Sequence, residues 1–472
     1  MRILLLNPTI RSGEPIVRAE RCQSKLISGI WPPIVLAYLA AILRRADRRI
    51  SILDAVIEGM PFEAMIRWII RDKPDWLIVQ NTTPTLPDDL VMARLVKDHL
   101  PDIHISFFGL HATARPGDVL QGGVVDTAML GEPETTAADL AAALDGAVSP
   151  TLVPGLACMD GNNVHRTPRR PPIQDLDALP WPDRDLLAND RYLIPTTRRP
   201  FTLVKTSRGC PHQCSFCTAA TFFGSRWRSR NPREVYDEMC LVHDRYGIRD
   251  IVLHADTFNH DRDTCMELLD LIRTGSRQFR WMSNTRVDTL DETMVRAMKD
   301  SGCWLVTMGV ESGDDAILLH NGKRATSLQA RTAIALLKRH GIRVIAYFLL
   351  GLPGETRETA EKTMRFALET EPDYAHFYVV TPFPGTVLFS RAAAAGWLTS
   401  RDWRRYYHGV SDVLSYPHLS ARDLTGLSRR YYRKFYFRPS RILNEIHGID
   451  DPRQMRGYLS TLKHMVRVWL IR

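Results

Sequence analysis

The hydrophobic positions of the first 148 residues follow two alternating patterns: short apolar runs rich in β-branched residues, and longer segments with helical spacing. The apolar runs predict five strands, at Arg2–Asn7, Ile50–Ala55, Trp76–Gln80, His104–Phe108 and Val124–Leu130. The helical spacing predicts five helices, at Pro33–Ala46, Pro61–Ile70, Asp88–His99, Ala114–Leu120 and Thr135–Leu144. Strands alternating with helices in this way indicate an α/β domain with an open, doubly wound parallel sheet.

Residues 149–200 interrupt this alternation with nine prolines, which predicts a linker without regular structure. From residue 201 the alternation resumes, and six further strands are expected at Thr202–Thr206, Asp250–His254, Arg280–Ser283, Leu305–Gly309, Arg343–Leu349 and Tyr374–Val380. The helices expected with them are Pro232–Tyr246, Asp263–Gly275, Asp291–Ser301, Ser327–His340 and Thr356–Thr370. Six β/α units over 201–398 are too few for a closed eight-stranded barrel. Residues 399–472 are expected to form a mainly helical C-terminal segment.

Three closely spaced cysteines, Cys210, Cys214 and Cys217, follow the first strand of this second region in a C-x3-C-x2-C array. Thiolates select zinc or an iron–sulfur cluster. Structural zinc needs a fourth Cys or His, usually as part of a second pair, and the loop residue His212 points to no such pair. An iron–sulfur cluster is therefore the favoured interpretation. A four-iron cluster held by three cysteines keeps one iron open for another ligand.

Composition limits the class of protein. The chain has 472 residues, of which 44% are hydrophobic, so two to three domains with real cores are expected. Its longest apolar run, Pro33–Leu43, is shorter than a membrane span. The other five cysteines are scattered singly, so no disulfide framework is expected, and the thiolate array requires a reducing compartment such as the cytoplasm.

The net charge of +9 lies in the C-terminal segment, because residues 401–472 contain 15 basic and 6 acidic side chains. Aromatic residues alternate with these basic ones. Such a composition is compatible with nucleic acid, with an anionic substrate or with a membrane surface. A packed helix with solvated arginines is the favoured interpretation, and nothing in the chain resembles a nucleic-acid-binding module.

The cysteine array and the six β/α units resemble the radical S-adenosylmethionine (SAM) superfamily. The resemblance implies a partial (β/α)6 barrel in which a [4Fe–4S] cluster binds SAM and cleaves it to a 5′-deoxyadenosyl radical. Residues after successive strands would then contact SAM: Asp256 its amine, Asn284 and Arg286 its carboxylate side, Glu311 and Ser312 its ribose, and Gly351 its adenine. A structural ion pair is the alternative role for Arg286.

An arginine-rich stretch, Gly224–Arg230, lies just beyond the array. Its arginines are interpreted as steadying the cluster or bound anions. For Arg226 and Arg230 a surface position is an equally good interpretation.

The first 148 residues resemble the flavodoxin-like cobalamin-binding domain found in some radical SAM proteins. Ligands of such sheets bind beyond the carboxyl ends of the strands, where the chain places five candidate contacts: Asn7, Thr82, Gly109, Gly131 and Glu132. The cobalt-ligating histidine of D-x-H-x-x-G domains is missing, because the nearest look-alike, Asp54–Gly59, has Val56 in its place. We therefore expect cobalt without that ligand, and loss of cobalamin and ligation by His111 stay open as alternatives.

The resemblance implies a cobalamin-dependent radical SAM enzyme that methylates an unactivated carbon of a small-molecule substrate. The alternative is an oxidative cyclase similar to the anaerobic magnesium-protoporphyrin ester cyclase, acting on an anionic or membrane-associated substrate. A non-catalytic cobalamin or redox sensor is a second alternative. The expected partners are an electron donor of the flavodoxin or ferredoxin type and, through the C-terminal segment, a membrane surface.

Overall fold

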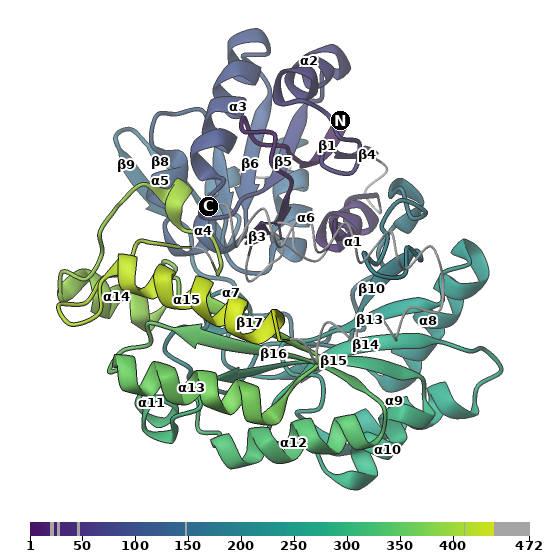
Figure 1. Ribbon diagram of the computed structural model, residues 1–472. Coiled ribbons are helices and arrows are strands. Elements are labelled where there is room, and N and C mark those ends of the chain that lie inside the picture. The colour runs from purple at the N-terminus through teal and green to yellow at the C-terminus, as the bar shows by residue number, and fades with distance from the viewer. Residues whose placement is uncertain (19–22, 26–28, 45–47, 147–148, 410, 439–472) are drawn as a thin grey trace.

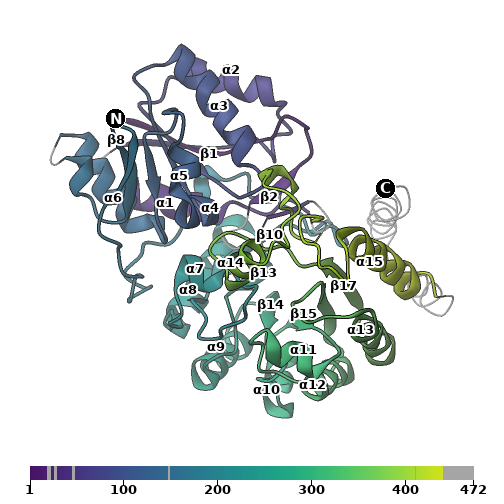
Figure 2. The same cartoon turned by 90° about the vertical axis from the view of Figure 1, so that its left-hand side faces the viewer.

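The computed structural model describes residues 1–18, 23–25, 29–44, 48–146, 149–409 and 411–438 (Figure 1). The chain forms two sheet-containing domains, and the N-terminal domain lies over one side of the second sheet (Figures 1 and 2).

Five parallel strands form the centre of the first sheet, in the order β4 (Arg49–Asp54), β1 (Arg2–Asn7), β5 (Trp76–Gln80), β6 (His104–Phe108) and β7 (Thr127–Met129). Numbered along the chain this order is 2-1-3-4-5, the flavodoxin-like arrangement. Alternate residues of β1 contribute to two different cores, Ile3 and Leu5 to one and Leu4 and Leu6 to the other. The doubly wound fold is thus confirmed.

Helices cover both faces of this sheet. One core includes α1 (Ile34–Arg44) and α6 (Pro133–Leu144), and the other includes α2 (Phe62–Asp72) and α3 (Leu86–His99). The helix predicted at Ala114–Leu120 is instead two short ones, α4 (Leu110–Ala114) and α5 (Pro116–Leu120). The break falls at Pro116, which has no N–H to continue the first helix.

The predicted linker was wrong for residues 156–166. Strands β8 (Leu156–Asp160) and β9 (Asn163–Arg166) form an antiparallel hairpin that extends the first sheet beyond β7. The prolines nearest to it, Pro154 and Pro168, flank the hairpin and do not interrupt it. A count of prolines over a 52-residue window therefore missed the proline-free stretch within it.

The second sheet has six parallel strands in chain order, which confirms the predicted partial barrel. They are β10 (Phe201–Lys205), β13 (Asp250–His254), β14 (Arg280–Thr285), β15 (Cys303–Glu311), β16 (Arg343–Leu350) and β17 (Tyr374–Val379). The helices along its other side are α8 (Pro232–Tyr246), α9 (Arg262–Thr274), α10 (Glu292–Asp300), α12 (Ser327–Arg339) and α13 (Arg357–Thr370) (Figure 1). Three short helices were not predicted: α7 (Ala219–Phe223), α11 (Asp315–His320) and α14 (Val387–Ala394).

Helix α15 (Ala421–Tyr436) lies along the free edge of the second sheet. The Ser428 hydroxyl donates to the carbonyl of Phe377, and the Tyr436 hydroxyl bonds both the N–H and the carbonyl of Ala375 in β17. These bonds occupy edge groups that another strand would otherwise pair with. The helix therefore closes the edge of the open barrel.

The two faces of α15 differ in chemistry. Its aromatic side chains are buried against the sheet, whereas five basic side chains are exposed: Arg422, Arg429, Arg430, Arg433 and Lys434. For the described part of the C-terminal segment this confirms a packed helix with solvated arginines, and residues 439–472 lie outside the described residues. Among the helices that are described, none is both long and apolar enough for a transmembrane span.

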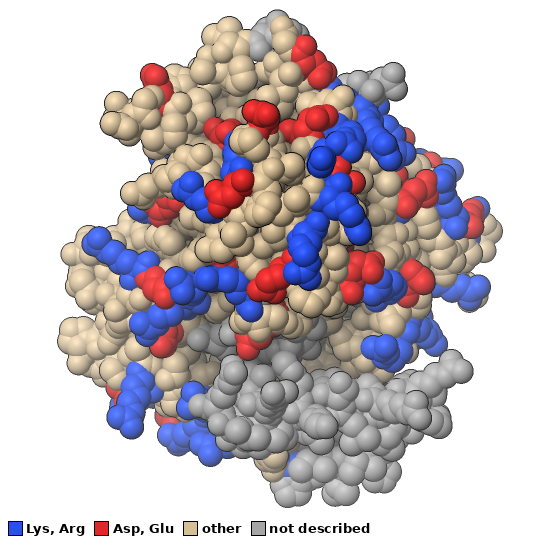
Figure 3. Space-filling view, turned by 90° about the horizontal axis from the view of Figure 1, so that it is seen from above, with Lys and Arg blue, Asp and Glu red and all other residues tan. Residues whose placement is uncertain are grey.

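Charge on the upper surface is mixed. Seen from above, basic and acidic side chains are interspersed over the N-terminal domain (Figure 3). Among the described residues of this face, positive and negative charges are therefore mixed, and no extended area carries only the positive charge that attracts nucleic acid.

Candidate active site

A short two-stranded ribbon closes the base of the cysteine loop. Strands β11 (Ser207–Arg208) and β12 (Arg228–Ser229) are antiparallel, with Arg208 directly opposite Arg228. Gly209, the first residue of the loop, has φ +83°, and a Cβ there would lie 2.1 Å from the carbonyl oxygen of Arg226. The Gly209 N–H donates to the Asp256 carboxylate at 2.6 Å. The predicted SAM contact Asp256 thus lies beside the cysteine loop.

The three cysteines lie on this loop, and none of them is in a disulfide. Cys210 Sγ lies 3.8 Å from the hydroxyl of Thr257, and Cys214 Sγ lies 3.8 Å from the carbonyl oxygen of Gly322. Burial raises the pKa of the Cys214 thiol, and the nearby Lys323 ammonium opposes that rise. Within the described residues no three Cys, His, Asp or Glu side chains converge on a single metal ion. Thiolates that bind different irons of one cluster do not need to converge on one point.

Two further predicted SAM contacts, Asn284 and Arg286, end β14. The Asn284 amide donates to the carbonyl of Asp256 at 3.1 Å. The Arg286 guanidinium makes two bonds to Asp288, at 2.9 and 2.7 Å, and a third to the carbonyl of Lys323. Arg286 therefore has the ion pair that was its alternative interpretation, and its contact with the SAM carboxylate stays a prediction.

Glu311 at the end of β15 has a partner that the sequence pattern did not indicate. The Lys323 ammonium donates to Glu311 Oε1 at 3.1 Å, and both side chains are largely buried. Glu311 also has φ +68°, a left-handed conformation that costs a non-glycine residue energy and is concentrated at functional sites. The neighbouring Ser312 is fully buried, and its hydroxyl bonds that of Thr363. Lys323 was missed because it follows α11, far from any strand end.

Gly351, the predicted adenine contact, is held by two side chains. Its N–H donates to Glu355 Oε2 at 2.5 Å, and its carbonyl accepts from the hydroxyl of Tyr416 at 2.7 Å. A Cβ at Gly351 would lie 2.9 Å from Leu424 Cδ1 in α15. Burial raises the pKa of Glu355 to about 8, and its Oε1 has no hydrogen-bond partner. The turn after β16 is thus held internally by a carboxyl group that prefers to be neutral, and it contacts the C-terminal segment through Tyr416 and Leu424.

Glu355 should make the stability of the protein depend on pH. Its pKa is higher in the folded chain than the ordinary 4.5, so the folded state binds more protons between pH 4.5 and 8 and the free energy of unfolding falls as pH rises. We expect a fall of about 2 kcal/mol between pH 5.5 and 7.5 from this group. Glu355→Gln, which resembles the protonated form, should remove that part of the slope in chemical denaturation measured at each pH. Equal slopes in the wild type and the variant would contradict the assignment.

The predicted cobalamin contacts line the carboxyl end of the first sheet. Gly109 has φ +126°, and a Cβ there would lie 2.2 Å from the carbonyl oxygen of Asn81, so only glycine fits. The hydroxyl of Thr82 bonds that of Thr85 at 2.9 Å. The Gly131 N–H donates to the hydroxyl of Thr113 at 2.9 Å. Glycines and hydroxyl groups therefore shape this end of the sheet, and the contact of these residues with a corrinoid stays a prediction.

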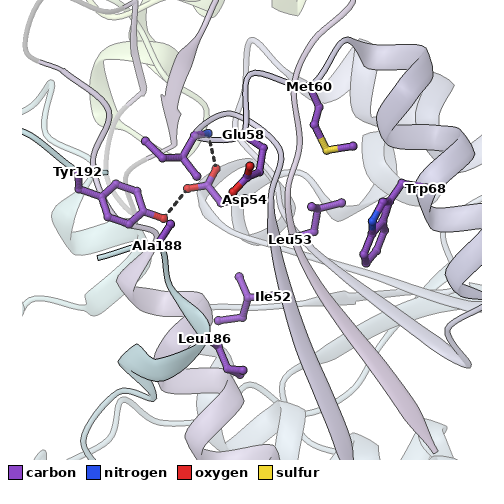
Figure 4. Close-up of a pocket in the computed structure, with 10 residues that line it drawn as sticks. Ile52, Leu53, Asp54, Glu58, Met60, Trp68, Leu186, Ala188 and Tyr192 are labelled. Carbon is purple, nitrogen blue, oxygen red and sulfur yellow. Dashed lines mark hydrogen bonds between the residues drawn. The ribbon is translucent and has the colours of Figure 1, made fainter. Parts of the chain in front are cut away.

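Asp54 and Glu58, from the D-x-V-x-x-G stretch, line a cavity beside β4 together with Tyr192 (Figure 4). The Asn7 amide donates to Asp54 Oδ1 at 2.8 Å, and the hydroxyl of Tyr192, from the linker, donates to Asp54 Oδ2 at 2.9 Å. The backbone N–H groups of Val56 and Ile57 also donate to Asp54 Oδ1. Asp54 therefore joins the linker to the first domain.

His111, the alternative cobalt ligand, is fully buried at the start of α4. Burial lowers the pKa of its imidazole, and the nearby Asp118 opposes that fall. Its Nδ1 lies 3.3 Å from the hydroxyl of Thr83 and its Nε2 lies 3.5 Å from Asp118. Its ring also contacts that of Trp403 edge-on. These neighbours make His111 a buried hydrogen-bonding residue of α4.

Glu132 and the arginine-rich stretch meet between the domains. Arg228 and Arg208 both pair with Glu132, and Arg208 also pairs with Glu134. Arg230 is buried and pairs with Glu238, so its predicted surface position was wrong, whereas Arg226 is exposed as that interpretation expected. The sequence could not reveal the arginine partners of Glu132 because Arg208 and Arg228 lie 76 and 96 residues away.

Aromatic rings line the inner side of β16 and β17. Tyr347 stacks on His376 with ring centroids 5.1 Å apart, and Tyr378 lies 5.1 Å from His376. Phe377, which alternates with them, contacts α15 on the opposite side. Burial lowers the pKa of His376 to about 4, so this wall of the barrel is uncharged.

Comparisons with known proteins agree with this architecture. The radical SAM superfamily model matches residues 204–367, and the B12-binding domain model matches residues 26–141. These domains imply a [4Fe–4S] cluster, SAM and cobalamin. The chain is 32% identical to an uncharacterised methyltransferase, PH0819, of Pyrococcus horikoshii, over 97% of this chain and 98% of that protein.

Two other proteins are informative, one similar in sequence and one similar in fold. The anaerobic magnesium-protoporphyrin IX monomethyl ester cyclase of Rubrivivax gelatinosus is 29% identical over 92% of this chain and 77% of its own length. The structure of the radical SAM methyltransferase TsrM from Kitasatospora setae, with cobalamin and a [4Fe–4S] cluster bound, superposes with a TM-score of 0.69 at 18% identity, covering 85% of this chain and 76% of that one. That likeness shows a shared fold.

Proposed function

Because the chain belongs to the cobalamin-dependent radical SAM enzymes, we propose that it transfers a methyl group to an unactivated carbon of a small-molecule substrate. The observation that carries this proposal is the similarity to the Pyrococcus horikoshii methyltransferase, which spans nearly the whole of both chains. No domain of either protein is therefore left out of the comparison.

The residues of the site suit the groups that this function needs. Cys210, Cys214 and Cys217 would hold the cluster, and Gly109 lets the Asn81 backbone approach closely at the end of the sheet where a corrinoid would lie. When bound, the cluster and SAM supply a radical and cobalamin supplies a methyl group. Val56 replaces the histidine of the D-x-H-x-x-G motif, so the protein would offer cobalt no ligand from that position.

The chain's own side chains would bind and orient SAM. Asp256 lies beside the cysteine loop, and a carboxylate suits an ammonium group. Glu311, held in a strained conformation by its bond to Lys323, presents a carboxylate that can accept from ribose hydroxyls. The uncharged wall around Tyr347 and His376 lies in the same barrel and would help to exclude water.

The proposal extends to partners and location. Reducing the cluster requires an electron donor of the flavodoxin or ferredoxin type, and keeping its thiolates reduced requires the cytoplasm. The basic face of α15 supports contact with an anionic substrate or membrane surface.

Oxidative ring closure is the second candidate function. It is favoured by the similarity to the ester cyclase of Rubrivivax gelatinosus, which extends over 92% of this chain. It ranks lower because the methyltransferase relative matches at higher identity and over more of its own length.

The two functions differ in the mass of the product. The experiment is anaerobic reconstitution with iron, sulfide and cobalamin, followed by incubation of extracts of the source cells with SAM labelled in its methyl group. Transfer of the label to a small molecule supports methylation. Deoxyadenosine formation with a ring-closed product that carries no label would overturn it.

A further inference from the structure

Four acidic and basic side chains meet, almost completely buried, where the N-terminal domain contacts the base of the cysteine loop. Glu132 and Glu134 come from the end of β7 and the start of α6, and Arg208 and Arg228 come from β11 and β12. Their exposed fractions are 6%, 1%, 2% and 5%. Buried charges persist only where they are paired, so this cluster depends on both domains.

The Glu132 carboxylate holds the centre of the cluster. Arg228 donates to it twice, with Nη2 2.5 Å from Oε1 and Nη1 3.2 Å from Oε2. Arg208 Nη1 lies 3.4 Å from the same Oε2, and Arg208 Nη2 donates to Glu134 at 2.5 Å. The N–H of Ile173, in the linker, also donates to Glu132 Oε2, at 3.1 Å. One carboxylate thus joins the first domain, the linker and both strands of the ribbon.

The ribbon needs this carboxylate because its own two strands place like charges together. Arg208 and Arg228 are directly opposite each other in the antiparallel pair. Like charges directly opposite in a sheet are destabilising, and burial strengthens their repulsion. Glu132 lies between them and compensates both. The base of the loop that bears Cys210, Cys214 and Cys217 is therefore complete only when the loop after β7 is in place.

The loop after β7 also packs directly on the cysteine loop. A Cβ at Gly131 would lie 3.7 Å from the carbonyl oxygen of Phe222, in α7. Gly131 is one of the residues predicted to line the corrinoid site, and α7 begins two residues after Cys217. The two segments are thus in contact within a few residues of both predicted cofactor positions.

We propose that Glu132 is a positioning residue that fixes the cysteine loop relative to the corrinoid side of the N-terminal domain. It acts through Arg208 and Arg228, and not by touching a reacting atom. Its catalytic consequence rests on the proposed function: methyl transfer between SAM and cobalamin needs both to be aligned, whereas reductive cleavage of SAM needs only the barrel and its cluster.

The first test uses the protein without cofactors. In Glu132→Gln, hydrogen exchange measured by mass spectrometry should increase by roughly tenfold or more both in residues 127–141 and in residues 207–230, because each segment loses its partner. Glu238→Gln is the matched control. Glu238 is also buried between two arginines, Arg184 and Arg230, but all three belong to the linker and the barrel. It should leave residues 127–141 unchanged.

A double variant tests whether Glu132 acts through Arg228. Glu132→Gln leaves Arg228 buried without its carboxylate, so adding Arg228→Gln removes the uncompensated charge and should restore part of the protection. Increased exchange confined to residues 127–141 in the single variant, or faster exchange in the double variant than in the single one, would overturn the proposal.

The second test separates two products of SAM in protein reconstituted with the cluster and cobalamin, with reductant and without substrate. S-adenosylhomocysteine reports methyl transfer to cob(I)alamin, and 5′-deoxyadenosine reports reductive cleavage. Glu132→Gln should lower the ratio of the first to the second by roughly tenfold. An unchanged ratio, or an equal fall in Glu238→Gln, would overturn the positioning role. If the wild type forms no S-adenosylhomocysteine, the proposed function fails, and the exchange experiment still tests the contact.

Discussion

Cys214→Ala should lower 5′-deoxyadenosine formation by roughly a hundredfold or more, because the radical originates at the cluster and three thiolates are the fewest that hold it. Cys214 is the middle ligand of the array, and its Sγ lies next to the carbonyl of Gly322 in the loop that carries Lys323. Loss of this thiolate leaves an iron without its protein ligand beside a site meant for SAM. The measurement is deoxyadenosine by mass spectrometry together with iron content per chain after anaerobic reconstitution.

Cys158→Ala is the control, because Cys158 lies in β8, on the hairpin of the first sheet. It should keep both iron and deoxyadenosine at wild-type levels. Thermal unfolding of the two variants without cofactors should match that of the wild type, which excludes misfolding as the cause. Deoxyadenosine production by Cys214→Ala at the wild-type rate would contradict the radical mechanism.

The sequence was sufficient for features that local patterns encode. Strand periodicity located eleven parallel strands of the described chain, five in the first domain and six in the second. Ten match apart from small shifts at their ends, and the strand predicted at Val124–Leu130 proved shorter, as Thr127–Met129. The cysteine spacing located a loop that the structure closes with a ribbon. Both kinds of signal lie within a few residues of the feature that they predict.

The features that the sequence could not predict depend on contacts between different helices, strands and loops. Lys323 reaches Glu311 only because α11 turns the chain back toward the end of β15. Arg230 looked like a surface residue, and its burial became evident only once Glu238 was found beside it. A charged residue is identified as buried only together with its partner, and a pair between two different elements leaves no pattern within either of them.

The ion pairs that join Glu132 to Arg208 and Arg228 explain why the two halves of the site cannot be considered separately. The candidate SAM contacts end the strands of the barrel, and the candidate corrinoid contacts end the strands of the first sheet. Glu132 belongs to the second group by position, yet its carboxylate bonds the base of the cysteine loop. The sequence assigned it to a cofactor because strand ends of such sheets bind ligands, whereas the structure provides it with arginine partners.

Gly109→Ala should destabilise the N-terminal domain by about 3 kcal/mol or more and abolish corrinoid binding. The backbone there, at φ +126° and ψ −171°, lies in a region that is essentially restricted to glycine and costs other residues about 1–3 kcal/mol. The added Cβ would also lie 2.2 Å from the carbonyl oxygen of Asn81, a backbone atom that cannot rotate away. Overpacking of this kind adds about 1–3 kcal/mol. Chemical denaturation and equilibrium binding of hydroxocobalamin measure the two effects.

Gly59→Ala separates the conformational cost from the contact. Gly59 also has positive φ, +64°, but nothing lies within 4 Å of the position its Cβ would take. It should cost only about 1 kcal/mol, which is the conformational cost without a close contact. If Gly109→Ala were no more destabilising than Gly59→Ala, the close approach of Asn81 would not be what requires glycine. If it lost stability but kept its affinity for hydroxocobalamin, Gly109 would shape the turn after β6 without lining the corrinoid site.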